Sequence, residues 1–310
     1  AQKPLTDYVN PMLGTATLWD SVDLGFKPTK RTWGAEVFPG SSLPNAMVQV
    51  SPVTKFHSGA GYQYEDSVIY GFTHTNKGHW NLCHIPLLPV TGTPTPGDYC
   101  SPFSHERESA APGYYQVFLD RYGVDAQLSS TLRCAFHKYT YPAGAAASLL
   151  ADLQRSNEHV RAWDIRKEGD NVFAGWQQTG EKMYFYAVAN RPVTGIEPVV
   201  EGDREVRIVR FGEGDGALEL RIGFSFVSEK NARENLEAEM LGKSFAEVRS
   251  EATATWNDLL GRIRVEGGTE REKGLFYSSL YRSFLWPALR SDVNGEFTDV
   301  GGKVLNPGFR

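Results

Sequence analysis

A dense group of residues that could bind a metal or move a proton lies between positions 74 and 84. It comprises His74, His79, Cys83 and His84, in the spacing H-x4-H-x3-C-H. On an extended strand His74 and His84 would share one face and His79 would point to the other. Compact zinc sites favour other spacings, such as C-x2-4-C with H-x3-5-H. The spacing therefore favours ordinary hydrogen-bonded histidines over a zinc site.

Nucleophilic hydrolysis finds little support in the sequence. The nucleophile-elbow pattern Gly-x-Ser-x-Gly is absent, and no Ser/His/Asp set stands out. The carboxylates of Glu65, Asp66 and Asp152 are interpreted as solvated or hydrogen-bonding surface groups. Aromatic residues make up 12% of the chain. Their apolar faces and polar tips suit β-structure and sugar-binding clefts, although core packing is the commoner use.

The bulk composition excludes several classes of partner. The formal charge is −5, and the longest basic cluster is Lys30-Arg31, so no basic stripe offers itself to nucleic acid. No apolar run approaches the roughly 20 residues of a membrane-spanning helix. The chain begins Ala-Gln-Lys-Pro without an apolar targeting segment, which fits a mature secreted protein or one trimmed at that point. The three cysteines allow either one bridge, Cys100 to Cys134, or three buried free thiols.

Short strands separated by turn residues dominate the chain from residue 5 to about 226. They are rich in Val, Phe, Tyr and Thr, and Gly, Pro, Asn and Asp fill the gaps. The predicted strands cover residues 46–50, 68–72, 114–119, 127–132, 138–141, 148–153, 183–189, 205–211 and 218–226. Strands that follow one another without helices between them predict a mainly β fold, an antiparallel β-sandwich over residues 1–226.

Helical signals begin near Ser228. Two capping boxes, 244–247 and 269–272, each place Ser or Thr at an N-cap and Glu three residues later. Apolar residues then recur at spacings of three and four, which predicts helices over about 229–260 and 270–286, the second ended by Pro287. Between them, 263–265 is predicted to form a brief strand. Residues 291–310 are Gly-rich and polar, and from this ending we expect a truncated chain or a companion chain that carries the remainder.

Several stretches, in order along the whole chain, resemble glycoside hydrolase family 92. They are 7–15, 38–52, 61–64, 69–75, 112–115, 128–133, 225–239, 267–270, 276–282 and 291–295. Each stretch alone is weakly specific, and their number and order carry the resemblance.

The resemblance implies a two-part, calcium-dependent exo-α-mannosidase that inverts the anomeric centre. Members have an N-terminal β-sandwich of the supersandwich type, a helical linker and a C-terminal (α/α)6 barrel. This chain would supply the sandwich (1–226) and the linker with the start of the catalytic domain (227–310). Inversion needs two carboxyl groups about 6.5–9.5 Å apart. The family carries these carboxylates and its calcium ligands in the barrel, so the isolated chain is expected to be inactive and to need the missing catalytic domain or a companion chain. A secreted, periplasmic or cell-surface location follows.

The family's sandwich also contributes to the wall of the active site. The residues expected to contact an α-mannoside glycan here are Phe38, Gly40, Ser41, His79, Trp80 and Asn81. Gly40 permits close approach of the backbone. Trp80 could stack on mannose, and His79, Asn81 and Ser41 could hydrogen-bond its hydroxyls. Alternatively, Phe38 and Trp80 are core or interface aromatics and Ser41 is a turn residue.

Two segments depart from the family pattern where the family meets its substrate. Residues 76–86 replace a longer Gly/Ser-rich loop, and 17–36 is extended. An α-1,2 linkage is the expected substrate, with α-1,3 and other mannosides left open. The alternative function is a non-catalytic carbohydrate-binding module, which would share the sandwich and the aromatics but has no use for the capped helices after Ser228.

Overall fold

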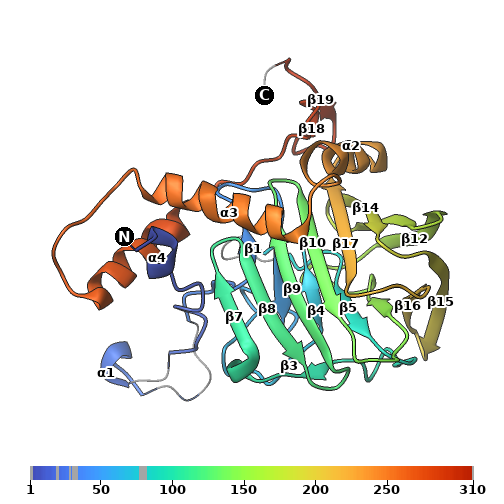
Figure 1. Ribbon diagram of the computed structural model, residues 1–310, viewed down its shortest axis with the longest axis horizontal. Coiled ribbons are helices and arrows are strands. Elements are labelled where there is room, and N and C mark those ends of the chain that lie inside the picture. The colour runs from blue at the N-terminus through green and yellow to red at the C-terminus, as the bar shows by residue number, and fades with distance from the viewer. Residues whose placement is uncertain (1–2, 19–20, 28, 30–33, 77–81, 309–310) are drawn as a thin grey trace.

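The computed structural model describes residues 3–18, 21–27, 29, 34–76 and 82–308. Two antiparallel sheets pack face to face (Figure 1). The seven-stranded sheet has the order β1 (Ser41–Ser42), β2 (Gln49–Val53), β4 (Gly71–Thr73), β5 (Leu87–Val90), β11 (Ser148–Ala151), β16 (Arg204–Phe211) and β15 (Val193–Glu201). This sandwich confirms the predicted fold class.

The second sheet has eight strands. Its order is β12 (Ala162–Gly169), β13 (Val172–Gln178), β14 (Lys182–Ala189), β17 (Leu218–Ser225), β10 (Cys134–Thr140), β9 (Val124–Ser130), β8 (Tyr114–Leu119) and β7 (Glu108–Ala111). Strand β14 shows why such segments form half-buried strands, because its residues alternate strictly between buried and partly exposed. The buried set, which includes Met183 and Phe185, joins the main core between the sheets.

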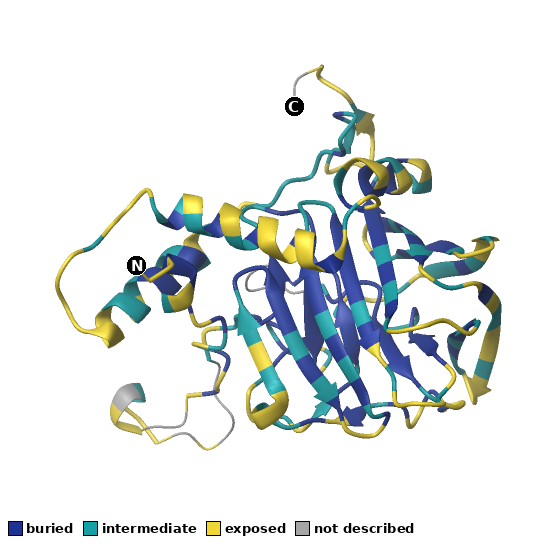
Figure 2. Ribbon diagram, viewed as in Figure 1, coloured by how far each residue is buried: buried dark blue, intermediate teal, exposed yellow. Residues whose placement is uncertain are grey.

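Three helices follow the last sandwich strand. Helix α2 (Glu229–Glu239) and helix α3 (Phe245–Leu260) lie over the outer face of the eight-stranded sheet, and α4 (Glu270–Ser283) lies beside α3 (Figure 1). Both predicted capping boxes are present, at Ser244–Glu247 and Thr269–Glu272. Figure 2 shows that the outward sides of α3 and α4 are exposed. The predicted single helix over 229–260 is thus two helices, and α4 ends before Pro287 because residues preceding proline avoid helical conformation.

The predicted strand at 263–265 is wrong. These residues form a turn followed by extended chain without a partner strand. The Tyr277 hydroxyl satisfies the backbone instead, since it accepts from the Val265 N–H at 3.2 Å and donates to the Ile263 carbonyl at 3.1 Å. All three cysteines are free, and Cys100 is only partly buried, so neither the Cys100–Cys134 bridge nor a full set of buried thiols is present.

Shorter elements complete the described chain. They are the helical turns η1 (Leu5–Tyr8) and η2 (His105–Arg107), helix α1 (Ser21–Leu24), and the strand pairs β3 (Val68–Ile69) with β6 (Ser101–Pro102) and β18 (Phe297–Thr298) with β19 (Val304–Leu305). No helix among the described residues is both long and apolar enough to cross a membrane.

One end of the sandwich is crossed by the chain after α4, and we call it the linker end. The Asn45 N–H donates to the Phe284 carbonyl at 2.7 Å, and the Arg133 guanidinium donates to the Ser291 carbonyl at 2.7 Å. The β1–β2, β4–β5, β9–β10 and β13–β14 connections join antiparallel neighbours at this end. The β11–β12 connection, which passes from one sheet to the other, lies there too, because β11 is antiparallel to β5 and β12 is antiparallel to β13. Loops at one end of a rigid sandwich are the usual place for a binding site.

Candidate functional site

The segment Phe38–Ser42 enters the sandwich at the linker end. The Phe38 side chain is 1% exposed and belongs to a core cluster formed by η1, α3 and α4. In that cluster the Trp256 ring lies 4.5 Å from the Tyr281 ring, and the Trp256 Nε1–H donates to the Ser42 carbonyl at 2.8 Å. Phe38 is therefore a packing residue between the sandwich and the helices in the described structure.

Gly40 and Ser41 are tied into the sheet. A Cβ at Gly40 would lie 2.1 Å from the Val50 carbonyl oxygen, so close approach of β2 requires glycine here. The Ser41 Oγ lies 2.7 Å from the Ser130 Oγ, and both side chains are buried. Neither residue exposes a side chain to solvent in this chain. Their contact with a sugar stays a prediction.

The other predicted segment, with His79, Trp80 and Asn81, lies outside the described residues. The residues on either side of it, however, are firmly placed. The Asn76 N–H donates to the Gln49 Oε1 at 3.0 Å, and the Asn76 Nδ2 donates to the Thr73 carbonyl at 2.8 Å. On the other side, the Leu82 N–H donates to the Thr75 carbonyl at 3.1 Å. These bonds close the base of the β4–β5 connection.

Gln49 brings the two predicted segments together. As a residue of β2 it pairs with Ser42, directly after Gly40 and Ser41, while its side chain receives the Asn76 N–H. The Gln49 side chain is fully buried, and its Nε2 donates to the Ala46 carbonyl at 2.8 Å. The 38–41 segment and the base of the 77–81 loop therefore meet on the first strand residue of β2.

Backbone strain is present at this loop base. Cys83 and Ile85 are buried and have positive φ angles of 52° and 54°. A β-branched residue in this region is a true outlier, at a cost of order 1–3 kcal/mol. The Ile85 N–H donates to the Gln177 Oε1 at 2.7 Å, so the surrounding network fixes the conformation. Such strain is concentrated at functional sites in proteins.

His74 belongs to a buried chain of hydrogen bonds. Its Nδ1 lies 3.0 Å from the Ile85 carbonyl, its Nε2 lies 2.9 Å from the His137 Nε2, and the His137 Nδ1 lies 2.6 Å from the Tyr139 hydroxyl. One assignment satisfies every atom: Tyr139 donates to His137, His137 donates to His74, and His74 donates to the carbonyl. Both rings are then neutral. Burial lowers the pKa of His74 to about 3, and burial followed by repulsion from His74 lowers the pKa of His137.

His84 makes a separate set of contacts that includes an exposed carboxylate. Its Nδ1 lies 3.0 Å from the Thr75 Oγ1, and its Nε2 lies 3.1 Å from the Thr179 Oγ1 and 3.8 Å from a Glu158 carboxylate oxygen. The last separation is longer than a hydrogen bond, so that contact is electrostatic. Interaction with the His84 side chain is the main cause that lowers the pKa of Glu158 to about 2. Sequence reasoning missed this pair, because Glu158 and His84 are 74 positions apart and no spacing rule connects them.

Three further carboxylates near the linker end are each hydrogen-bonded or ion-paired. The buried Asp292 accepts from the Ser225 hydroxyl at 2.6 Å and from the Asn231 and Asn235 side-chain amides at 2.8 and 2.9 Å. Glu239 pairs with Arg133 at 2.7 Å, and Glu181 pairs with Arg290 at 2.7 Å. These groups join the sandwich to the segments that follow it.

Asp152 corrects one sequence interpretation. It is fully buried rather than on the surface, and it accepts hydrogen bonds of 2.6 Å from both the Tyr99 hydroxyl and the Arg204 guanidinium.

Within the described ranges, no group of three or more His, Cys, Asp or Glu side chains could hold a metal ion. The buried histidines of the 74–84 segment are engaged in hydrogen bonds, since His74 bonds to His137 and His84 lies between two threonines. The described residues therefore offer no carboxylate cluster of the kind that binds calcium.

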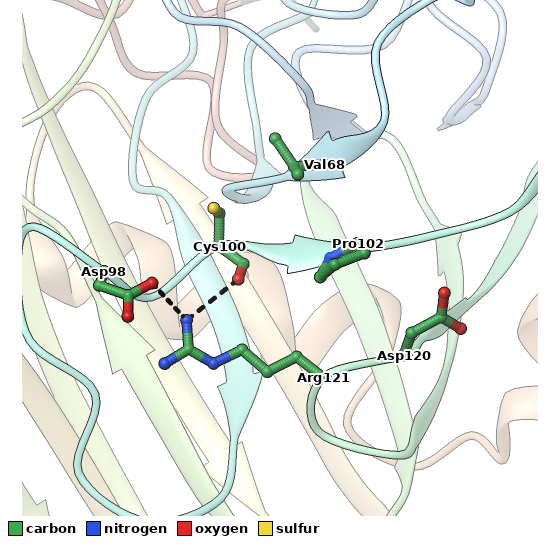
Figure 3. Close-up of a pocket in the computed structure, with 6 residues that line it drawn as sticks. All are labelled: Val68, Asp98, Cys100, Pro102, Asp120 and Arg121. Atoms are coloured by element: carbon green, nitrogen blue, oxygen red, sulfur yellow. Dashed lines mark hydrogen bonds and ion pairs between the residues drawn. The ribbon is translucent and has the colours of Figure 1, made fainter.

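The end of the sandwich opposite the linker end has one shallow hollow, shown in Figure 3. Its volume is about 450 Å³, and it is lined by Val68, Asp98, Cys100, Pro102, Asp120 and Arg121. The Arg121 guanidinium donates to the Asp98 carboxylate at 2.8 Å and to the Cys100 carbonyl at 3.3 Å. None of the residues predicted to bind sugar contributes to this hollow.

Comparison with known protein families identifies the family of this chain. Residues 8–235 match the family model described as "Glycosyl hydrolase family 92 N-terminal domain", and residues 231–309 match "Glycosyl hydrolase family 92 catalytic domain". The chain belongs to glycosyl hydrolase family 92, as its sequence resemblance predicted.

Known structures agree with this assignment. The family GH92 α-mannosidase BT3965 from Bacteroides thetaiotaomicron is 26% identical, with a TM-score of 0.86 over 98% of this chain and 44% of its own. The inverting family GH92 mannosidase BT2199 from the same organism is 25% identical, with a TM-score of 0.79 over 99% of this chain and 42% of its own. An "Uncharacterized secreted glycosidase" of Arthroderma benhamiae is 24% identical over 93% of this chain. The chain spans 42% of that relative, so it corresponds to less than half the length of each.

Proposed function

We propose that this chain is the amino-terminal part of a secreted α-mannosidase that removes terminal α-mannose from glycans with inversion, with α-1,2 linkages as the expected substrates. The observation that carries the proposal is the pair of adjoining family matches, in which the N-terminal domain model ends at residue 235 and the catalytic domain model begins at 231. The names of the similar proteins, an α-mannosidase, an inverting mannosidase and a secreted glycosidase, support the same reading.

The catalytic carboxylates are proposed to lie outside this chain, in the rest of the family's catalytic domain. A general acid must hold its proton near the working pH. Glu158, with its pKa of about 2, is ionised throughout that range. Asp292 is enclosed by three donors and Glu239 is paired with Arg133, so neither is placed to exchange a proton with a substrate.

Calcium belongs to the same proposal. The described residues provide no cluster that could bind it, so its ligands are expected in the remaining catalytic domain. That domain, on the same or a companion chain, would be the principal partner of this sandwich. In the reaction, this chain would form one wall of the substrate site and hold the glycan in place.

The proposed wall is the linker end, formed by Phe38, Gly40, Ser41, His79, Trp80 and Asn81. Phe38, Gly40 and Ser41 are buried in this chain and would support the wall from within. Of the wall residues, Trp80 gives the sharpest test, because loss of its stacking should weaken mannoside binding by about 1–3 kcal/mol. In the enzyme with its catalytic domain, Trp80→Ala should lower kcat/KM with little change in Tm. A lower Tm with normal kinetics would instead make Trp80 a packing residue.

The activity is tested with two proteins. One is the 310-residue chain. The other is a longer protein, expressed from the same gene, that includes the rest of a family 92 catalytic domain. Each is assayed with an activated aryl α-mannoside in calcium or in a chelator, and the first-formed anomer is read by NMR. We expect inversion by the longer protein and no turnover by the shorter one. Calcium-dependent hydrolysis by the pure 310-residue chain, or retention of the anomeric configuration, would overturn the proposal. Glycan binding without hydrolysis by the longer protein would favour a carbohydrate-binding module.

A further inference from the structure

Glu158 carries an ionised, partly exposed carboxylate at the linker end, beside the buried His84. Its pKa is lowered first by His84 and then by the Thr179 side chain and the Gly180 backbone N–H, against the opposing effect of partial burial. The Glu158 N–H also donates to the Ser156 Oγ at 2.8 Å, and the Ser156 Oγ donates to the Glu158 carbonyl at 3.0 Å. The backbone of Glu158 is therefore held before any ligand binds, and its carboxylate lies 3.8 Å from the His84 Nε2.

His84 is oriented so that it presents one N–H toward Glu158. The Thr75 Oγ1 already accepts the His84 backbone N–H at 3.1 Å, so its own proton is free to point at the His84 Nδ1, 3.0 Å away. The Nδ1 is then the acceptor and the Nε2 carries the proton, facing the Thr179 Oγ1 and Glu158. This ring is 1% exposed, whereas the Glu158 side chain is 40% exposed. A buried histidine thus supports a carboxylate that reaches solvent.

The Glu158 carboxylate lies beside the base of the β4–β5 connection. Its neighbour Asn157 donates its backbone N–H to the Leu82 carbonyl at 2.9 Å, and Thr75, which holds His84, also accepts the Leu82 N–H at 3.1 Å. The β11–β12 and β4–β5 connections are thereby joined. A carboxylate has about four acceptor positions, and an exposed, ionised one with its remaining positions open to solvent is suited to accept hydrogen bonds from two adjacent sugar hydroxyls.

We propose that Glu158 is a specificity-determining residue that accepts hydrogen bonds from hydroxyls of the leaving-group sugar, and that His84 is its positioning residue. This proposal rests on the proposed function. The catalytic carboxylates of the remaining domain would enclose the reacting mannose. The linker end of the sandwich would then contact the leaving-group sugar. A carboxylate that is already partly buried beside a histidine loses less conformational freedom on binding than a fully exposed one.

The test uses the enzyme that includes its catalytic domain, with two kinds of substrate. An aryl α-mannoside has no leaving-group sugar, whereas α-linked mannobioses do. We expect Glu158→Gln to lower kcat/KM for the preferred mannobiose by about 10- to 100-fold, the usual range for a hydrogen bond to a charged group. Turnover of the aryl mannoside should stay within about twofold. His84→Asn should show the same pattern with a smaller loss, because it removes the support and keeps the carboxylate.

Glu197→Gln is the matched control, since Glu197 also carries a partly exposed carboxylate beside a basic side chain, in its case Arg210 at 3.1 Å. It should leave both substrates unaffected. Equal loss on both substrates, or no loss on the mannobiose with Glu158→Gln, would overturn the inference. If Glu158→Gln does not fold, Glu158→Asp, which keeps the charge and withdraws the carboxylate, should show the same selective loss. A wild-type enzyme inactive on both substrates would instead overturn the proposed function.

Discussion

At the linker end of the sandwich, side chains far apart in sequence are buried together, whereas the opposite end carries an ion pair open to solvent. Trp256 and Ser42 are joined by a hydrogen bond across 214 positions, and both are fully buried. At the other end, Asp98 and Arg121 are 78% and 33% exposed. A buried contact between distant parts of the chain thus lies at the end where the family match passes into the catalytic domain. The contrast can be tested by substitution at each end.

The largest effect is expected at Trp256. Trp256→Ala removes a fully buried indole, its contact with Tyr281 and its hydrogen bond to Ser42. The free energy of unfolding should fall by about 3–5 kcal/mol, as for other large-to-alanine changes in a core. Urea denaturation followed by fluorescence measures this. A loss below about 1 kcal/mol would mean that the helices contribute little to the linker end.

Gly40→Ala should destabilise the linker end, because the added methyl group would overpack the contact with β2. The added methyl would meet the Val50 carbonyl oxygen at 2.1 Å and the Ser51 Cβ at 2.4 Å. Because both belong to β2, the backbone must move, and a loss of about 3 kcal/mol is expected, at the upper part of the usual range for overpacking. Gly202→Ala, at a site with nothing within 4 Å of the new methyl, controls for loss of glycine, although its φ of 64° adds a strain of its own. A neutral Gly40→Ala would show that the β1–β2 contact is adaptable.

The buried histidine chain makes stability fall on acidification. In the unfolded chain a histidine titrates near 6.5, whereas in the fold the pKa of His74 is lowered to about 3. The unfolded state therefore binds more protons, and the stabilisation present above about pH 6.5 is lost as the pH falls toward 3. Each histidine should contribute about 2 kcal/mol of loss between pH 7 and pH 5.

Urea denaturation at both pH values, compared with His137→Gln, isolates this effect. The variant should lose roughly 2 kcal/mol less than the wild type over the interval, because one of the two titrating groups is absent. Identical losses would show that the pair is already protonated in the fold.

The smallest effect is expected at the far end. Arg121→Ala removes the exposed pair with Asp98 and should change the free energy of unfolding by only about 0.2–1 kcal/mol. A larger loss would remove the distinction between the two ends. Raising the salt concentration should weaken this pair in the wild type and leave the variant unchanged.

Much of the sandwich could be predicted from the sequence because its strands alternate or are strongly apolar. Residues 114–119 were predicted as a strand and form β8 with the same limits. Strands β5, β7, β12, β13 and β15 were not predicted. Of these, β12 and β15 lie at sheet edges, where charged residues, a glycine and Pro198 are tolerated, and so they lack the usual signal.

The candidate site was less accessible to sequence reasoning. The resemblance pointed to the 38–41 segment, but Phe38 and Ser41 were expected to face sugar and here are buried. The His84–Glu158 pair forms only because the β4–β5 and β11–β12 connections meet in space, and no local pattern records that meeting. The contribution of the first residues to α4 was also unpredicted, since it depends on contacts across almost the entire chain.

The contacts between the first residues and α4 have a consequence for folding during synthesis. The Asn10 N–H donates to the Ser278 Oγ across 268 positions, and the Arg282 guanidinium donates to the carbonyls of Pro11 and Leu13. During synthesis, the segment that holds η1 emerges before α4 but cannot reach its final partners until α4 has left the ribosome. At a typical elongation rate of about 5–20 residues per second, it therefore waits for many seconds with Leu5 and Val9 uncovered. A nascent chain halted before residue 270 should thus present this segment to proteases or chaperones, whereas one halted after α4 has emerged should protect it.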